Sequence, residues 1–206
     1  MGDLRERHIK RICIFCGSSL GVKKEYAHSA IELGRILAQK KIALVYGGGR
    51  VGIMGQLAKA CLEAGGEVIG VIPKQLYKMG LGYTKLTRLH LVNSMHERKA
   101  MMSDLSDGFI ALPGGLGTIE EFFEALTWAQ LGIHRKPCGL LNTAGYYDKL
   151  MEFIGNAVKQ EFLEKEHKDM ILVSEKPIDL MAKFRAYRAP KASKVIWVLE
   201  KTGNLV

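Results

Sequence analysis

Short apolar runs alternate along the chain with longer segments in which apolar residues recur at the spacing of one helix face. The runs predict strands at 11–16, 42–47, 67–72, 85–92, 107–113, 138–142 and 170–174, of which 85–92 is the weakest. The longer segments predict helices at about 23–40, 52–64, 94–105, 118–131, 146–162 and 177–187. Most of the strands are continuously apolar, as strands covered on both faces are. The pattern predicts an α/β fold, a three-layer sandwich around a central, mostly parallel sheet.

The length of 206 residues fits one domain with one core. We expect that domain to span residues 1–190 and to be followed by a C-terminal tail, 191–206, to which the sequence assigns no role. The chain begins with the charged segment MGDLRERHIKR, and no run approaches the roughly 18 apolar residues of a membrane span. We therefore expect a soluble, cytoplasmic protein with no membrane partner.

The cysteines and the net charge each suggest a function that the rest of the sequence disfavours. Cys13 and Cys16 form a C-x-x-C, but they lie within a predicted strand and no second pair completes a zinc site. We expect reduced core thiols, and neither metal nor redox chemistry.

The net charge of +9 suggests nucleic acid, but the basic residues are dispersed, and the densest stretch lies between Lys183 and Lys194. We expect no nucleic-acid partner, and attraction of a small anionic substrate stays open.

Three glycine- and serine-containing loops follow predicted strands. CGSS follows the first strand, YGGGRVGIMG the second, and LPGGLGTIEE the fifth. Parallel α/β sheets bind their ligands beyond the carboxyl ends of the strands, where such loops meet. The candidate site is therefore at this edge of the sheet.

The loop PGGLGTIEE has the composition of a phosphate cradle. Gly114, Gly115 and Gly117 permit close backbone approach, and Thr118 opens the predicted helix, whose free N–H groups attract anions. Two simpler interpretations stay open. The segment is also compatible with an ordinary strand-to-helix turn, and Thr118 and Glu121 match a capping box, in which the glutamate only bonds the first helical amide.

The segment SMHERKAMM predicts a helix with Ser94 as its N-cap and Glu97 as the capping partner. Arg98 and Lys99 then lie in the second turn, where the helix dipole disfavours positive charge, so we expect either an anionic partner or simple solvent exposure. Met95, Met101 and Met102 are expected to pack this helix against the sheet.

The segment from Gly47 to Gly52 satisfies G-x-G-x-x-G and follows a strand, as a dinucleotide-binding loop does. The next predicted strand ends in apolar residues and proline instead of the acid that holds a ribose, so nicotinamide binding is disfavoured. We interpret this loop as backbone close to a nucleotide's phosphate or sugar.

The string LPGGLGTIEE, with MHERK upstream and WAQLGIHRKP downstream, resembles the Lonely Guy (LOG) family of cytokinin-activating enzymes, whose signature is P-G-G-x-G-T-x-x-E. The resemblance covers roughly residues 10–165 in the same order and spacing. Members are Rossmann-like homodimers that split N6-modified adenosine monophosphates into ribose 5-phosphate and the free base without metal or redox cofactor. Many were long labelled lysine decarboxylases, for which this sequence offers no convincing pyridoxal-phosphate lysine.

The resemblance implies roles for individual residues. The catalytic arginine and glutamate fall on Arg98 and Glu121. The implied substrate-binding residues lie on the three loops and on the two helices that carry the catalytic pair: Ser18, Gly48, Gly49, Met95, Lys99, Gly114, Gly115, Gly117, Thr118 and Glu120. The chain departs from plant members after VIPK, where KQLYKMGLGYTK is basic while they usually carry an acidic residue.

The resemblance implies hydrolysis of the N-glycosidic bond of a nucleoside 5′-monophosphate by a homodimer or higher homo-oligomer, with the helices at 94–105 and 118–131 near the partner subunit. The alternative is a noncatalytic nucleotide sensor or carrier, because the same loops are able to bind a nucleotide without cleaving it. A nucleic-acid-binding module is the third interpretation and is favoured by charge alone.

Overall fold

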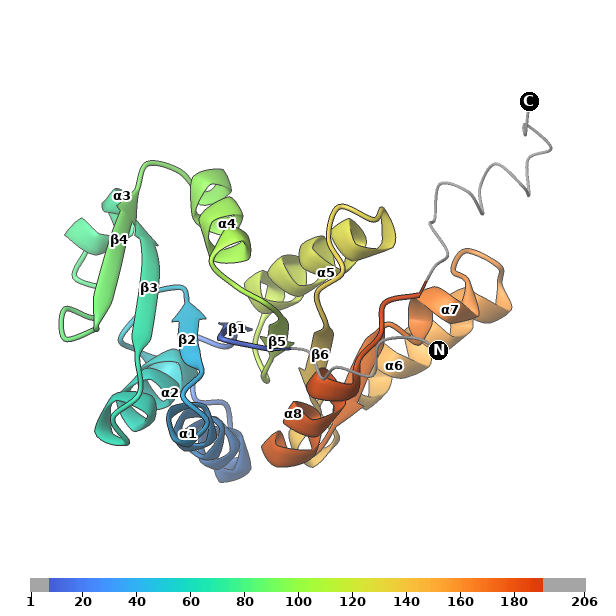
Figure 1. Cartoon of the computed structure of the whole chain (residues 1–206), viewed down its shortest axis with the longest axis horizontal. Helices are drawn as coiled ribbons and strands as arrows, with labels where there is room; N and C mark the ends of the chain where they lie inside the picture. The colour runs from blue at the N-terminus through green and yellow to red at the C-terminus, as the bar shows by residue number, and fades with distance from the viewer. Residues whose placement is uncertain (1–7, 191–206) are drawn as a thin grey trace.

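The computed structural model describes residues 8–190 as a three-layer α/β sandwich (Figure 1). The predicted tail at 191–206, with the basic residues Lys191 and Lys194, lies outside the described residues. Within the described part of the chain, no helix is long and apolar enough to cross a membrane.

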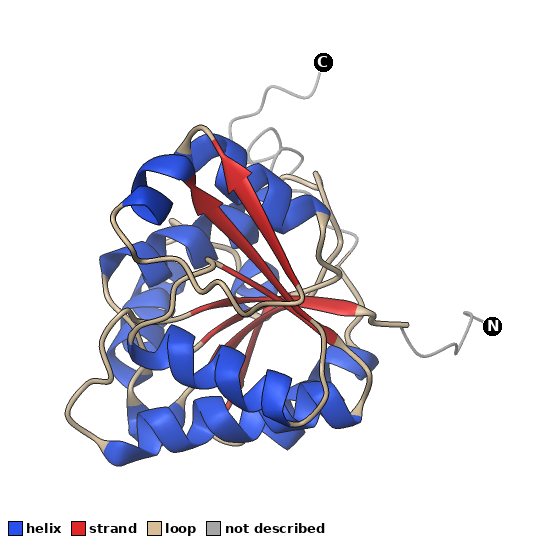
Figure 2. Cartoon of the chain, turned by 90° about the vertical axis from the view of Figure 1, so that its left-hand side faces the viewer, coloured by secondary structure: helices blue, strands red, loops and turns tan. Residues whose placement is uncertain are grey.

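The central sheet contains all seven predicted strands. They are β1 (Arg11–Phe15), β2 (Ala43–Tyr46), β3 (Val68–Pro73), β4 (Arg88–Val92), β5 (Phe109–Ala111), β6 (Cys138–Leu141) and β7 (Ile171–Ser174). Their order is β4-β3-β2-β1-β5-β6-β7, and every neighbouring pair is parallel. The α/β prediction is confirmed, and the sheet is entirely parallel. The twist of the sheet fans the strands, as Figure 2 shows.

The six predicted helices are present as α1 (Lys24–Gln39), α2 (Gly52–Glu63), α4 (Met95–Asp104), α5 (Leu116–Gln130), α6 (Asp148–Lys159) and α8 (Pro177–Ala186). The sequence pattern missed α3 (Lys74–Lys78), α7 (Lys165–Lys168) and the short 3₁₀ helix η1 (Thr143–Gly145). These elements are too short to carry a helical hydrophobic period. The prediction at 146–162 was too long at both ends, because α6 spans only Asp148–Lys159.

Each face of the sheet has its own core. Leu33 of α1, Leu57 of α2 and Phe184 of α8 are fully buried against one face. Met102 of α4 and Phe122 of α5 are buried against the other. The four cysteines are buried free thiols within these layers, which agrees with the prediction for them.

The strand order places the three candidate loops together. The chain builds β1 to β4 outward in one direction and then crosses back to place β5 beside β1. The loops after β1 and β5 therefore leave adjacent strands in opposite directions, which opens a crevice at the carboxyl edge of the sheet. This crevice is where the sequence predicted the site.

Helices α1 and α2 approach closely at a glycine, which gives a test of the packing. A Cβ on Gly34 would lie 2.7 Å from the carbonyl oxygen of Leu57, whereas a Cβ on Gly155 of α6 would meet nothing nearer than 3.9 Å. We expect Gly34→Ala to lower the free energy of unfolding, because overpacking costs about 1–3 kcal/mol. The matched control Gly155→Ala should raise it by up to about 1 kcal/mol through helix propensity. Urea unfolding of both variants measures the difference, and equal effects would contradict the packing described.

Candidate active site

The loop after β5 begins its helix earlier than the sequence predicted. Gly115 is the N-cap and α5 starts at Leu116, so Thr118 does not open the helix but lies in its first turn. Glycines favour loops, so the pattern did not show that Gly117 is helical. The capping-box interpretation of Thr118 and Glu121 is wrong, because Thr118 is not the cap and Glu121 bonds an arginine instead.

The start of α5 forms an open rim at the crevice. The first N–H groups of an α-helix have no acceptor within the helix, and a Cβ on Gly115 or Gly117 would meet no atom within 4 Å. The buried Thr118 side chain packs against Gly114, where a Cβ would overlap the threonine hydroxyl. Exposed amides at a helix start attract anions, so the rim suits a phosphate group.

The loops after β1 and β2 close the other side of the crevice. The Gly17 N–H donates to the Pro113 carbonyl at 3.1 Å, which ties the loop after β1 to the loop after β5. The Gly17 carbonyl accepts from Ile53 N at 3.1 Å and from Met54 N at 3.4 Å, at the start of α2. Ser18 is therefore held between two helix starts.

Helix α4 is capped as predicted, with one difference. The Ser94 hydroxyl accepts a hydrogen bond from the Glu97 N–H at 3.1 Å. The Glu97 carboxylate accepts from the backbone and side-chain nitrogens of Asn93, at 2.7 and 3.2 Å, and not from the Ser94 N–H. The cap fixes where α4 begins and so where Arg98 points.

Arg98 and Glu121 form a largely buried ion pair. Arg98 Nη1 donates to Glu121 Oε1 at 2.5 Å, and each side chain is 12% exposed. Arg98 Nε donates to the Val71 carbonyl of β3 at 3.1 Å. The guanidinium lies so close to Gly47 that a Cβ there would overlap Nη2. The expectation of an anionic partner is confirmed for Arg98, and the solvent-exposure alternative is wrong.

Lys99 is also paired. Its Nζ donates to Glu120 Oε1 at 2.5 Å and to Glu124 Oε1 at 3.0 Å, and its side chain is 13% exposed. Hydrogen bonding to Glu120 raises the pKa of Lys99, with burial opposing the effect. Two parallel contacts therefore join α4 to α5, and the Lys99 contact holds Glu120 beside Glu121.

A cavity of about 340 Å³ lies between these elements. Ser18, Met95, Arg98, Glu120 and Glu121 line it, together with Gly115, Gly117 and Thr118 at the start of α5. A smaller hollow of about 290 Å³ shares Gly17, Ser18 and Gly115 with it and is also lined by Gly114. Most of the candidate residues thus surround one two-part cleft.

Three of the candidate residues lie outside the cavity wall. Gly48 and Gly49 are buried, and their carbonyls accept from Tyr83 N at 2.9 Å and from the Tyr46 hydroxyl at 3.1 Å. Lys99 lies behind Glu120. Met95 is 46% exposed and lines the cleft, so its predicted packing against the sheet is wrong, while Met102 is buried as predicted.

Sequence reasoning did not single out several residues of the cleft. Gly47 and Met54 line the cavity, and Tyr26 and Tyr146 line the smaller hollow, where the Tyr146 hydroxyl donates to the Gly114 carbonyl at 2.6 Å. Gly47 carried a signal, since it opens the glycine-rich loop. The tyrosines carried none, because nothing in the pattern brings their segments to the crevice.

The electrostatics of the cleft centre on Glu121. Burial raises the pKa of its carboxyl, and the Arg98 guanidinium opposes the effect without cancelling it. Burial also raises the pKa of the Cys13 and Cys16 thiols, which keeps them neutral and unreactive. The cleft therefore contains a carboxyl group of raised pKa beside a fixed guanidinium.

Comparisons with known proteins give matches over most of the chain. A family model described as "Possible lysine decarboxylase" matches residues 54–184. The probable cytokinin riboside 5′-monophosphate phosphoribohydrolase LOGL6 of Oryza sativa subsp. japonica is 47% identical, over 96% of this chain and 80% of the relative. The cytokinin riboside 5′-monophosphate phosphoribohydrolase LOG1 of Arabidopsis thaliana is 47% identical, over 96% of this chain and 94% of the relative.

Among solved structures, the molybdenum cofactor binding protein of Rippkaea orientalis has a similar fold. The TM-score is 0.65 at 21% identity, over 89% of this chain and 98% of that protein. This likeness concerns the fold alone.

The ion pair predicts that loss of either charge destabilises the fold, because each charge is largely buried and has the other as its ion-pair partner. Arg98→Ala leaves the Glu121 carboxylate buried without its partner and should lower the free energy of unfolding by about 3 kcal/mol. Glu121→Gln keeps an acceptor for Arg98 Nη1 but leaves the buried guanidinium without a counter-charge, so it should also lower the free energy of unfolding, by about 1–3 kcal/mol. The double variant should be more stable than Arg98→Ala alone. Urea unfolding measures all three, and an Arg98→Ala cost no larger than that of Lys149→Ala, at an exposed pair, would contradict the assignment.

Proposed function

This chain belongs to the Lonely Guy family of cytokinin riboside 5′-monophosphate phosphoribohydrolases, and we propose that it hydrolyses the N-glycosidic bond of N6-modified adenosine 5′-monophosphates. The reaction releases the free base and ribose 5-phosphate. The observation that carries the proposal is the buried Arg98–Glu121 pair, which faces one cavity together with the open start of α5.

The start of α5 is the proposed phosphate site. Its free N–H groups and the small residues Gly115 and Gly117 allow phosphate oxygens to approach the backbone. Anchoring the phosphate there places the ribose over Glu121, one helical turn further along α5. A nucleoside without the phosphate loses this orientation as well as affinity.

Glu121 is the proposed stabiliser of the transition state. Cleavage of the C1′–N bond builds positive charge on the ribose as the base leaves with the bonding electrons, and a fixed carboxylate nearby lowers the energy of that charge. Water adds to C1′, and one of its protons ends on the departing base. Glu121 is also placed to orient this water.

Arg98 has two roles in the proposal. Its ion pair favours the charged form of Glu121 against the effect of burial. Its remaining N–H groups are able to stabilise charge on the substrate phosphate or on the departing purine. Met95 and Leu116 add apolar surface at the mouth of the cleft, where they are 46% and 90% exposed.

A panel of substrates tests the proposal. The protein is incubated with adenosine 5′-monophosphate, an N6-prenylated analogue and the corresponding nucleosides, and the free base and ribose 5-phosphate are followed by chromatography. We expect cleavage of the monophosphates and little of the nucleosides. Binding of the monophosphates without cleavage would favour the sensor or carrier function instead.

Glu121→Gln separates catalysis from structure. Glutamine keeps the hydrogen bond but removes the negative charge, so turnover should fall on the order of 10²–10³-fold or more. The matched control is Glu63→Gln on the exposed end of α2, which should not change turnover. An unchanged rate in Glu121→Gln, measured at a temperature at which the variant is folded, would exclude the catalytic role.

The pH dependence gives an independent test of Glu121. The ionised carboxylate is the active form, and its pKa is raised, so turnover should fall with decreasing pH at a higher pH than an exposed glutamate would give. The phosphate group of the substrate also titrates, near pH 6, but this titration affects the pH profiles of the wild-type protein and of Glu121→Gln alike. The additional acid limb should be absent from the residual activity of Glu121→Gln. An identical kcat profile in both proteins would show that another group titrates.

A homodimer or larger assembly is part of the proposal. Exposed apolar side chains near α4 and α5 support it: Met95, Leu116, Leu131 and Ile133. Light scattering should give at least twice the mass of one chain, and an active protein that stays monomeric would contradict it. A cytoplasmic location stays a prediction from the sequence.

A further inference from the structure

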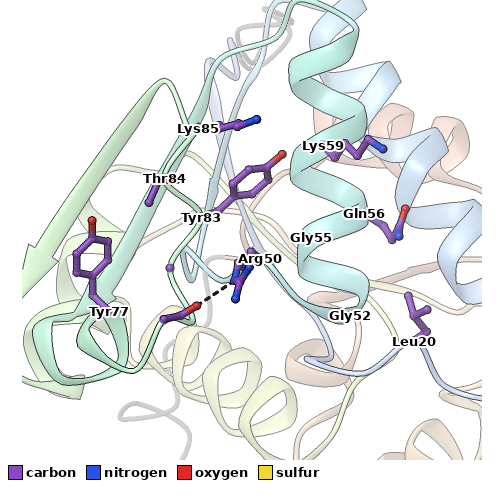
Figure 3. Close-up of a pocket in the computed structure, with 12 residues that line it drawn as sticks. Leu20, Arg50, Gly52, Gly55, Gln56, Lys59, Tyr77, Tyr83, Thr84 and Lys85 are labelled. Carbon is purple, nitrogen blue, oxygen red and sulfur yellow. Dashed lines mark hydrogen bonds between the residues drawn. The ribbon is translucent and has the colours of Figure 1, made fainter.

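A second cavity, of about 640 Å³, lies outside the catalytic cleft (Figure 3). It is bounded by α2, by the loop that leads into α2, and by the loop between α3 and β4. The polar residues of its wall are Arg50, Gln56, Lys59, Tyr77, Tyr83, Thr84 and Lys85. None of them lines the cleft that contains Arg98 and Glu121.

The wall of this cavity is basic and contains no acidic residue. Three separate segments supply its cations: Arg50 before α2, Lys59 on α2 and Lys85 after α3. Within residues 8–190, Lys59 has one ion pair, with Glu63 at 3.7 Å, and both side chains are more than 60% exposed. A pair this long and exposed neutralises little charge. The cations from these three segments therefore give the cavity a positive potential.

Arg50 is held in place by the backbone. Its Nε donates to the Gly80 carbonyl at 2.9 Å, and its N–H donates to the Leu81 carbonyl at 3.1 Å. Gly80 has a φ of +76°, which the turn requires. The loop thus orients the guanidinium through one nitrogen, and in the described part of the chain no acidic side chain forms an ion pair with Arg50 or Lys85.

The tyrosines and the threonine complete the wall. In Figure 3, Tyr83 and Lys85 face Lys59 of α2 across the cavity, and Arg50 lies at its base. The hydroxyls of Tyr83 and Thr84 are donors, and the tyrosine ring is a surface on which a planar or apolar group packs. We propose that this cavity binds a small molecule that carries a phosphate dianion, either a phosphomonoester or free phosphate.

The site is tested by amide NMR with three probes: inorganic phosphate, phenyl phosphate and phenol. We expect saturable shifts of the amides at residues 80–85 with both phosphates, weakening as ionic strength rises. A tighter response to phenyl phosphate than to inorganic phosphate identifies a phosphomonoester as the preferred ligand, and equal responses identify free phosphate. Binding in the catalytic cleft shifts the amides at 115–118 instead, so the two sites are read separately.

Two matched variants locate the site. Arg50→Ala with Lys85→Ala removes two cations of the wall and should raise the half-saturation concentration on the order of tenfold or more, since the loss of even one charge-assisted hydrogen bond weakens binding by about that factor. The control, Arg35→Ala with Lys149→Ala, removes the same amount of charge from exposed positions elsewhere and should leave the half-saturation concentration unchanged. An amide spectrum that matches the wild type elsewhere shows that each variant is folded.

Three results would overturn the proposal: no saturable shift at 80–85 with either phosphate, the same half-saturation in the cavity variant as in the control, or equal shifts with phenol. None of them depends on whether the cleft hydrolyses nucleotides.

Discussion

Arg98 and Glu121 come from the helices that precede and follow β5, and they meet at 2.5 Å with little access to solvent. Two charges in such a place are stable only while each has the other, because an unpaired buried charge costs several kcal/mol. The pair also depends on its surroundings, since Arg98 is held by the Val71 carbonyl and needs Gly47 to have no side chain. One contact therefore fixes the relative positions of strand β3, the loop after β2, and helices α4 and α5.

The parallel sheet makes this contact possible. Every strand ends at the same edge of the sheet. Strands β2 to β4 lie on one side of β1 and strands β5 to β7 on the other, so the loops after β1 and β5 leave in opposite directions and a crevice opens between them. The Gly17 carbonyl joins the β1 loop to the start of α2, and the Gly17 N–H joins it to the β5 loop. The loop from Gly47 to Gly52 connects the two sites: its first residue touches Arg98, and Arg50 lines the basic cavity.

The sequence predicted what depends on local pattern. All seven strands followed from apolar runs, and the Ser94 cap followed from its residue type and spacing. The resemblance supplied the roles of Arg98 and Glu121, and the residues alone left a capping role for Glu121 open. Because the glycines hid the true start of that helix, the first turn was misplaced.

What the sequence did not predict depends on tertiary contact. Arg98 and Glu121 are 23 positions apart, and no pattern records that their side chains meet. The two lysine contacts to Glu120 and Glu124 are of the same kind. Gly47 was one of several glycines in its loop, and only the position of the Arg98 guanidinium shows why this one must lack a side chain.

The central claim is that the fixed Arg98–Glu121 pair is the catalytic centre, and kcat of Gly47→Ala tests it most directly. The added Cβ would overlap only the flexible end of Arg98, so the fold should remain intact while the guanidinium is displaced. The account predicts a fall in kcat on the order of tenfold or more, the size of one lost charge-assisted contact, and no further fall when the change is made in Arg98→Ala. Wild-type turnover in Gly47→Ala, or the same fall in the Arg98→Ala background, would contradict it.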